Sequence, residues 1–337
     1  MKKTIFTLAM LCCAIVGNAQ VTDEISAILQ VGDNAQIFYG ADAYAQALEA
    51  APDAGGVITL SSGTFNAAEI SKSVAVYGAG WVTENSTPTT SGSDNSLKAT
   101  SITGVQTISA SGGVYMEGLR FEGNLNVTKA IDGLDFVKCW WYGKNLIFAE
   151  QNDNVTFTQC YIYCEMNKLH KVLFQNCWIY FSWTYNLFSA ESDVVINHCL
   201  LADAYGSNTV QKEWARFRCL NSMVFTGDYK NPVQTYQYCT IDKANLDGYT
   251  GSSDNWFSVS DNKGIFADQN NKAYSDTRTF ELSDEAKATY IGSDGTQVGI
   301  NGGNYPWNKT PHTPLVTDLK VTIDGTNLKV TYNAETR

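Results

Sequence analysis

Proline, basic residues and long apolar runs are scarce in this chain of 337 residues. It has six prolines and no low-complexity stretch of the kind that joins domains, which favours one elongated domain. Lys and Arg number 23 against 34 Asp and Glu, and this argues against nucleic acid or an anionic membrane surface as partner, since both attract basic patches. No apolar stretch after the N-terminus approaches the roughly 20 residues that a membrane-spanning helix needs.

The first 19 residues have the pattern of a secretory signal peptide. Lys2 and Lys3 form a basic start, residues 5–16 form an apolar run too short to span a membrane, and Gly17 and Ala19 are small residues at the cleavage-reading positions. We therefore predict export to the periplasm, the cell surface or the medium. The remaining chain has 21 basic and 34 acidic residues, a net charge of about −13, which favours solubility.

The most informative pattern is a ladder of cysteines at positions 139, 160, 177, 199, 219 and 239, in steps of 17 to 22 residues. Apolar residues stand five and three places before the cysteine and two places after it, as Val155, Phe157 and Ile162 do around Cys160. This alternation indicates two half-buried strands separated by a bend. A repeat of about twenty residues matches one turn of a β-solenoid.

Each cysteine of the ladder is expected to fill a tight inward corner of its coil. Side chains stacked on adjacent coils lie ~4.8 Å apart, slightly more than the ~3.5–4.5 Å between the Cβ atoms of a disulfide. We therefore expect the seven cysteines after the signal peptide to be buried free thiols, with disulfides as the alternative that export would favour. Cys160 and Cys164 lack the further pair or histidine of a zinc site.

Several stretches carry a resemblance to a known superfamily. They are AYAQALEAA at 43–51 with GGVITLSSGTF at 55–65, NVTFTQCYI at 154–162, VLFQNCWI at 172–179 and DGTQVGINGGNYP at 294–306. The first four resemble the capping helix, first strand-turn and coil signature of pectin-lyase-like β-helix proteins, and the last is similar to the closing segment of secreted β-helix proteins of Bacteroidetes. The resemblance covers about residues 40 to 310 and implies an all-β, single-stranded right-handed parallel β-helix. It specifies no activity, because the superfamily holds lyases, hydrolases and adhesins.

The predicted organisation is a signal peptide at 1–19, a lead and capping helix at 20–52, a β-helix with its closing segment at 53–310 and a tail at 311–337. A Ser/Thr/Gly-rich loop at 83–100 leaves an early coil. In the tail, two alternating runs flank a polar turn at 324–327, which predicts a β-hairpin. We expect this hairpin to cover the edge of the last coil, which would otherwise pair with other chains.

Two aromatic columns are the strongest functional signal. If each cysteine points inward, the residues one and three places after it point outward, and on three successive coils these positions are aromatic: Trp140, Tyr161 and Trp178 form one column, and Tyr142, Tyr163 and Tyr180 the other. Exposed aromatic patches mark contact surfaces, and amphipathic rings suit the faces and hydroxyls of sugars. The alternative is that residues 181–185, the loop at 83–100 or a second protomer covers the columns.

The arginines give a weaker signal for catalysis. Arg216 and Arg218 alternate beside Cys219, and Arg218 falls in the position before the cysteine. Elsewhere that position holds a polar column beside the turn, which is its simpler interpretation: Lys138, Gln159, Asn176 and His198. The resemblance implies that a lyase would need a basic residue, commonly with calcium held by carboxylates, and that a hydrolase would use paired aspartates in a motif that this chain lacks.

Carboxylates and histidines add little more. Glu150 with Asp153, and Glu191 with Asp193, are pairs of the type that hydrolyses glycosides, but acids are ordinary at solenoid turns. The three histidines, His170, His198 and His312, have no spaced serine or acid partner that suggests a triad. Catalytic residues are therefore left unassigned.

The sequence predicts an exported, non-catalytic β-helix protein that contacts a polysaccharide, a cell-surface glycan or another surface partner through its aromatic face. One alternative is a polysaccharide lyase or glycoside hydrolase acting on a uronate-containing or other complex polysaccharide. Another is a structural solenoid that dimerises through the aromatic face. We expect no cofactor, no metal site, no nucleic-acid partner and no membrane span.

Overall fold

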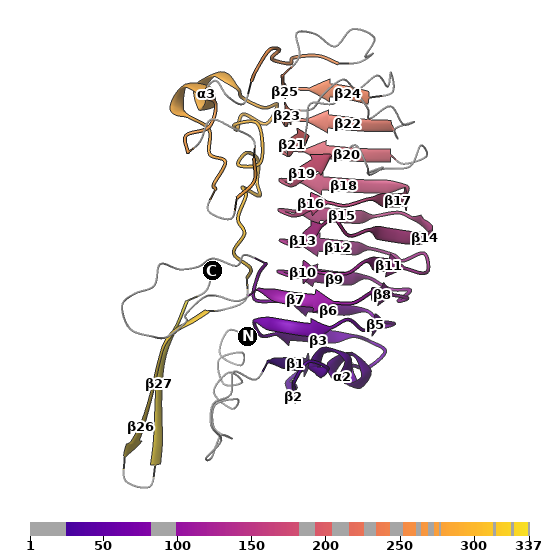
Figure 1. The fold of residues 1–337 in the computed structure, drawn as a ribbon, viewed down its shortest axis with the longest axis vertical. Coiled ribbons are helices and arrows are strands. Elements are labelled where there is room, and N and C mark those ends of the chain that lie inside the picture. Colours follow the sequence, from indigo (N-terminus) through magenta and orange to yellow (C-terminus); the bar gives the residue numbers. More distant parts are fainter. Residues whose placement is uncertain are drawn as a thin grey trace.

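The computed structural model describes residues 25–81, 99–181, 193–203, 216–225, 234–242, 252–260, 264–268, 273–275, 278–312, 315–324 and 327–335. Over these ranges the chain winds into a stack of coils whose parallel strands lie one above another (Figure 1). The predicted parallel β-helix is confirmed. The predicted signal peptide, most of the loop at 83–100 and the excursion after residue 181 lie outside the described residues.

Three parallel sheets run along the stack. Sheet A contains β3 (Gly56–Leu60), β6 (Val74–Tyr77), β9 (Val114–Glu117), β12 (Leu134–Val137), β15 (Val155–Thr158), β18 (Lys171–Gln175), β20 (Asp193–Asn197), β22 (Arg216–Leu220) and β24 (Gln234–Gln237). Sheet B contains β4 (Gly63–Asn66), β7 (Thr100–Thr103), β10 (Arg120–Phe121), β13 (Trp140–Tyr142), β16 (Tyr161–Tyr163), β19 (Trp178–Phe181), β21 (Leu200–Asp203), β23 (Met223–Phe225) and β25 (Thr240–Ile241). Sheet C contains β5 (Glu69–Ile70), β8 (Gln106–Ile108), β11 (Leu125–Val127), β14 (Leu146–Asn152) and β17 (Met166–Leu169).

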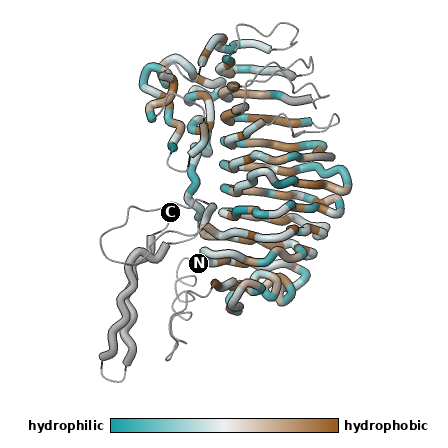
Figure 2. Tube along the Cα trace, in the orientation of Figure 1, coloured by the Kyte–Doolittle hydropathy of each residue, from teal (hydrophilic) through white to brown (hydrophobic). Residues whose placement is uncertain are grey.

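Alternate side chains of these strands point into the stack and form one continuous apolar core. Figure 2 shows hydrophobic and hydrophilic residues alternating along the coils. Phe136, Phe157 and Phe174 occupy equivalent positions on successive coils, with ring centroids 5.2 and 4.8 Å apart. Because the coils are spaced ~4.8 Å apart, equivalent side chains stack directly on one another. Each fully buried phenylalanine contributes about 1.5–3 kcal/mol.

The cysteines line one inward corner. All seven in the described part of the chain are buried and free, which confirms the expectation of free thiols. The backbone N–H of Cys139 donates to Sγ of Cys160 at 3.4 Å, and that of Cys160 donates to Sγ of Cys177 at 3.4 Å. The thiols of Cys160 and Cys177 thus each accept a bend N–H from the coil before them. Burial raises the pKa of the Cys139 and Cys164 thiols, which keeps them protonated and unreactive.

The predicted corner position of one cysteine, Cys219, is wrong. Cys219 lies inside β22, in register with Ile196, and Ser222 takes the corner, where its Oγ accepts from the N–H of Cys199 at 2.9 Å. Arg218 is therefore not in the column before the corner, and Asn221 holds that position. The pattern permits this shift because Phe217, Cys219 and Ser222 fit the same spacing of inward residues, and both inward positions accept small side chains.

The N-terminal end of the stack is capped. Helix α2 (Ala43–Ala50) buries Ala43, Tyr44, Ala47 and Leu48, as the predicted capping helix should. Lys72 Nζ donates to the carbonyls of Leu48 at 3.3 Å and Glu49 at 2.9 Å, which satisfies the C-terminal end of that helix. Strands β1 (Ser26–Val31) and β2 (Asn34–Tyr39) lie in the segment before the capping helix, for which the sequence predicted no strand. They form a hairpin that extends sheet A in antiparallel register.

The C-terminal hairpin is present but not where it was expected. β26 (Leu315–Asp324) and β27 (Asn327–Glu335) pair with each other in antiparallel register and join no other described strand. Before them the chain returns along the stack (Figure 1). At the end of this return His312 contacts Glu117 of β9. The hairpin therefore begins beside the early coils, and the expectation that it covers the last coil is wrong.

Helices are rare in the described part of the chain. Besides α2 there is α3 (Asp284–Thr289), which the sequence reading missed although Ser283 before two acidic residues is a helix-start signal. The Oγ of Ser283 accepts from the N–H of Ala286 at 3.4 Å. Neither described helix has the length and apolar character that crossing a membrane requires.

Candidate functional site

Residues 291–312, here called the strap, run along the outside of the stack from the later coils back to β9 (Figure 1). The strap crosses one coil after another and is hydrogen-bonded at each. Its contacts, in order, are Ser293 with Asn221, Asp294 with His198, Ile300 and Gly302 with Asn176, Tyr305 and Pro306 with Gln159, Thr310 with Lys138, and His312 with Glu117.

The strap is anchored by the polar column, which lies at the bend between sheets A and B. Its members share a left-handed backbone with φ from 49° to 54°: Lys138, Gln159, Asn176, His198 and Asn221. All are buried, and their side chains bond to the strap. Asn176 Nδ2 donates to the carbonyls of Ile300 at 2.9 Å and Gly302 at 2.7 Å, and Lys138 Nζ donates to the carbonyl of Thr310 at 2.6 Å. The predicted polar stack is real, and it fastens a distant segment.

Each histidine has a carboxylate partner from a distant part of the chain. His170 Nδ1 lies 2.6 Å from Asp153 Oδ1, and His198 Nε2 lies 2.8 Å from Asp294 Oδ2. The sequence spacing did not indicate these acid partners, because a linear spacing cannot show contacts made between coils. Hydrogen bonds from Lys171 and then His170 lower the pKa of Asp153, so this acid of the proposed Glu150–Asp153 pair stays ionised in an ion pair.

The other carboxylate candidates are also engaged or outside the described residues. Glu150 Oε2 accepts from the N–H of Ala130 at 3.1 Å. Asp193 Oδ1 lies 3.9 Å from Arg218 Nη2, and Glu191 is outside the described residues. No group of three or more side chains that could hold a metal ion occurs within the described ranges.

A polar cluster lies where the strap ends. Glu117 is 1% exposed, and its carboxylate accepts from Tyr115 Oη at 2.7 Å and from the backbone N–H of His312 at 2.9 Å, with His312 Nδ1 at 2.6 Å. Burial and then the bond to Glu117 raise the pKa of Tyr115, and burial lowers the pKa of Lys138. The His312 side chain is 63% exposed, so a buried carboxylate orients an accessible imidazole.

The two predicted aromatic columns exist. Trp140, Tyr161 and Trp178 are in register on β13, β16 and β19, with ring centroids 5.7 and 4.9 Å apart and planes within 19°. The second column is equally regular. Tyr142 and Tyr163 have centroids 4.9 Å apart, and Tyr163 and Tyr180 4.8 Å, in edge-to-face contacts.

The expected exposure of the first column is wrong for two of its members. Tyr161 is 5% exposed and Trp178 is 1% exposed. Trp81 packs 6.2 Å from Tyr161, Tyr274 packs 4.5 Å from Tyr161, and Trp307 of the strap packs 6.1 Å from Trp81. The cover is therefore supplied by the chain itself, from segments far away in the sequence, and the stacked rings form a second apolar core outside sheet B.

The second column stays open to solvent at one end. Tyr142 is 54% exposed, while Tyr163, Tyr180 and Trp140 are half-buried. Tyr142 stacks on Trp140, and the guanidinium of Arg120 lies 4.1 Å from the centroid of the Trp140 ring. We call Trp140, Tyr142, Tyr163 and Tyr180 the aromatic edge. It is the part of the predicted aromatic face that remains accessible.

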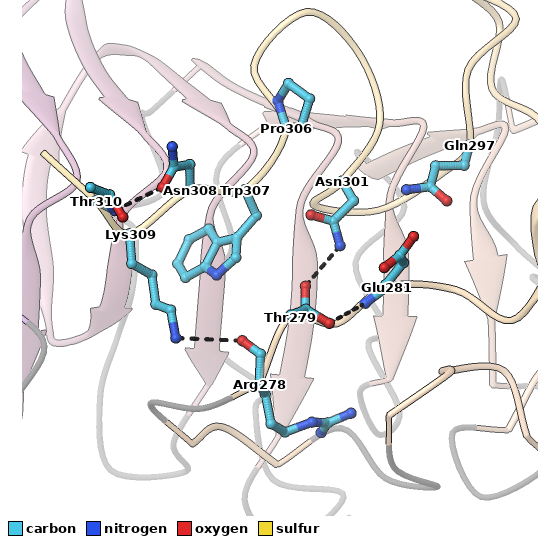
Figure 3. Close-up of a pocket in the computed structure, with 10 residues that line it drawn as sticks. All are labelled: Arg278, Thr279, Glu281, Gln297, Asn301, Pro306, Trp307, Asn308, Lys309 and Thr310. Carbon is cyan, nitrogen blue, oxygen red and sulfur yellow. Dashed lines mark hydrogen bonds between the residues drawn. The ribbon is translucent and has the colours of Figure 1, made fainter. Parts of the chain in front are cut away.

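A pocket that the sequence reading missed opens beside the strap (Figure 3). Its volume is about 510 Å³, and its lining combines amides, charged groups and an indole: Arg278, Thr279, Glu281, Gln297, Asn301, Pro306, Trp307, Asn308, Lys309 and Thr310. We call it the strap pocket. Local sequence gave no signal for it, because its walls meet only after the chain has folded back along the stack.

The charges around the strap pocket are largely paired. Arg278 is 2% exposed, its Nη2 lies 2.9 Å from Asp268 Oδ1, and its guanidinium lies 4.3 Å from the Phe280 ring centroid. Glu281 Oε1 lies 2.5 Å from Lys287 Nζ. The buried arginine therefore holds the segment in place, and the pocket presents mainly amides and apolar surface.

Comparison with protein-family models, curated proteins and solved structures returned no match. The structure shows a parallel β-helix, and these comparisons assign the chain to no family.

Proposed function

We propose that this protein is exported and binds a polysaccharide or cell-surface glycan through the aromatic edge, without catalysing a reaction. The observation that carries this proposal is the edge itself, in which three coils present tyrosines with ring centroids 4.9 and 4.8 Å apart and Tyr142 is 54% exposed. Aromatic side chains with a polar tip offer both a flat apolar contact and a hydrogen bond, as sugar rings require.

The physical setting supports a row of contacts. The strap contributes to the cover of the neighbouring column, and Trp140, Tyr163 and Tyr180 of the aromatic edge pack against the resulting apolar core. Rings fixed by packing lose little conformational entropy on binding. A repeating ligand lying across the coils would meet one ring per coil, which favours a polymer over a single sugar.

Export and family membership belong to the same proposal. Residues 1–19 support export, and the motifs at 43–65, 154–179 and 294–306 support a place among pectin-lyase-like proteins, near secreted β-helix proteins of Bacteroidetes. Fractionation of cells that express the full chain, or a chain lacking residues 2–19, tests export: only the full chain should leave the cytoplasm. Full chain retained in the cytoplasm contradicts this part.

Glycan binding is tested with the double variant Tyr142→Ala, Tyr163→Ala on an array of polysaccharides. We expect binding to weaken about tenfold or more, since each aromatic contact is worth about 0.5–1.5 kcal/mol beyond its buried area. The matched control is Tyr39→Ala, because Tyr39 is 52% exposed but lies on β2 at the N-terminal end. Equal binding by the double variant and the control would rule out the aromatic edge.

A second candidate function is a polysaccharide lyase or hydrolase, and one observation favours it. Buried Glu117 orients the exposed imidazole of His312 next to Tyr115, an arrangement suited to proton transfer. Product release from a panel of polysaccharides, measured with and without calcium, tests this function. Activity that His312→Ala abolishes would replace the non-catalytic proposal, and inactivity on the whole panel would leave the cluster as an anchor of the strap.

A third candidate function is that of a structural solenoid that dimerises through the aromatic edge. Light scattering distinguishes it from glycan binding and from catalysis. A dimer that Tyr142→Ala dissociates would replace glycan binding as the role of this surface. A monomer would exclude dimerisation.

A further inference from the structure

The strap pocket has the size of a site for a small molecule. Its volume of about 510 Å³ lies within the range of roughly 300–1,000 Å³ that is usual for ligand pockets. Two stretches form its walls, residues 278–281 and residues 297–310 of the strap (Figure 3). Both are fixed in place, since Asn301 Nδ2 donates to the carbonyl of Thr279 at 2.8 Å and Asn308 Oδ1 accepts from the N–H of Thr310 at 2.8 Å.

Two polar groups of residues that line this pocket lack a hydrogen-bond partner among the described residues. The side-chain oxygen of Gln297 is buried and accepts no hydrogen bond from the residues that the structure describes. Figure 3 shows the Gln297 side chain directed toward Glu281 and Asn301 across the pocket. Leaving a buried acceptor unsatisfied is costly, so proteins normally supply a donor from the chain, from water or from a ligand. The indole N–H of Trp307, in the pocket wall, is likewise buried without an acceptor.

The lining selects the chemistry of a ligand. Arg278 is paired with Asp268 and Glu281 with Lys287, and Lys309 Nζ donates to the carbonyl of Arg278 at 3.5 Å, so each charged group of the lining already has a contact within the chain. Side-chain amides carry both a donor and an acceptor, which matches the hydroxyl group. Gln297, Asn301 and Asn308 supply side-chain amides, of which Asn301 already donates to Thr279 and Asn308 already accepts from Thr310, and Pro306 and Trp307 supply an apolar wall. This combination suits a neutral ring that carries several hydroxyls on one side and C–H groups on the other.

We propose that the strap pocket binds one neutral sugar unit, with the side-chain amide of Gln297 hydrogen-bonded to a sugar hydroxyl. This inference rests on the proposed glycan-binding function and adds a second contact, made by the strap, to the row of contacts along the aromatic edge. The aromatic edge would bind several units of a polysaccharide, and the strap pocket would bind one unit of the same polysaccharide.

The test uses Gln297→Met, which keeps the length of the side chain and removes the amide. The protein is titrated with methyl glycosides of glucose, galactose and mannose and with N-acetylglucosamine at millimolar concentration, and binding is read by saturation-transfer NMR and by tryptophan fluorescence. We expect at least one sugar to bind, and Gln297→Met to weaken it about threefold to tenfold, the effect of losing one neutral hydrogen bond. Glucuronate serves as the charged comparison and should bind less well.

The same variant separates binding from a structural role. Without ligand, Gln297→Met should unfold at the same or a higher temperature, because it removes an unsatisfied buried acceptor and breaks no hydrogen bond of the Gln297 side chain that the structure describes. The matched control is Gln36→Met, an exposed glutamine on β2. A lowered unfolding temperature together with unchanged sugar binding would overturn the proposal.

Binding of no sugar in the panel by the native protein would also overturn it. Failure of this inference is distinct from failure of the proposed function. The first leaves the polysaccharide binding of the Gln297→Met variant unchanged, and the second leaves the polysaccharide binding of the Tyr142→Ala, Tyr163→Ala variant unchanged. A sugar whose binding is abolished by the tyrosine changes and untouched by Gln297→Met would assign the whole interaction to the aromatic edge.

Discussion

Replacing Asn176 should detach the middle of the strap from the solenoid. This side chain is 0% exposed, donates to the carbonyls of Ile300 and Gly302, and belongs to a residue with φ of 52°. Asn176→Ala removes both hydrogen bonds and places a residue with a poor left-handed tendency at the bend. Because the strap covers the aromatic core outside sheet B, its loss should expose that core.

The magnitude follows from these two effects. Two buried hydrogen bonds contribute about 1–3 kcal/mol together, and the left-handed backbone costs alanine about 1 kcal/mol more than asparagine. We therefore expect Asn176→Ala to lower the free energy of unfolding by about 2–4 kcal/mol. Asn176→Gly, which accepts the positive φ, should lose only the hydrogen-bond part, about 1–3 kcal/mol.

Urea unfolding followed by tryptophan fluorescence measures both changes, because Trp81, Trp178 and Trp307 are buried at the contact between strap and sheet B. The fluorescence should shift to the red at lower urea in both variants, and earlier in Asn176→Ala. Losses below about 0.5 kcal/mol in both variants, the range of ordinary surface substitutions, would refute the view that this column fastens the strap.

Three further predictions concern the cap, the thiols and acid stability. Lys72→Met should destabilise the protein by about 1–3 kcal/mol, because it leaves carbonyls at the end of α2 without their donor, and thermal unfolding measures this. The seven cysteines from Cys139 to Cys239 should not react with a thiol reagent until denaturant is added, since all seven are buried in the described part of the chain; reaction of these thiols in the native protein would contradict their placement. Burial alone would raise the pKa of Asp294, but hydrogen bonds from Thr296 and His198 outweigh it and lower the pKa. Its stabilisation is therefore complete above the unfolded value of about 3.9 and is lost as the pH falls through the folded value. Asp294→Asn should lower stability at neutral pH and flatten the loss in acid, as urea midpoints across a pH series would show.

Local periodicity was enough to predict the coils. The spacing around Cys160 and Cys177 places inward and outward residues correctly, because each coil must bury the same face against its neighbours. The same spacing misplaced Cys219, since two inward positions three residues apart accept the same kinds of side chain. A repeat therefore predicts the fold more reliably than it predicts the register of each strand.

The candidate site was only half predictable. The aromatic columns followed from the register of β13, β16 and β19, but their cover did not, because Tyr274 and Trp307 reach Tyr161 and Trp81 from more than a hundred residues away. The partners of the histidines and the strap pocket have the same origin. Contacts across the stack leave no trace in local patterns, so a sequence alone underestimates burial on the outer face of a solenoid.

The strap also sets a limit on how such a protein can change in length. Solenoids commonly grow or shrink by duplication or deletion of whole repeats, since each repeat contacts only its neighbours. Here every coil from the one holding Glu117 to the one holding Asn221 is matched to its own place on the returning segment. Loss of a coil would shift all later anchors past their partners unless about four residues of the strap were lost with it, since the anchors from Ser293 to His312 span five coil-to-coil steps. The length of the strap is thus matched to the number of coils. We expect the number of coils and the length of the strap to change together among relatives of this chain.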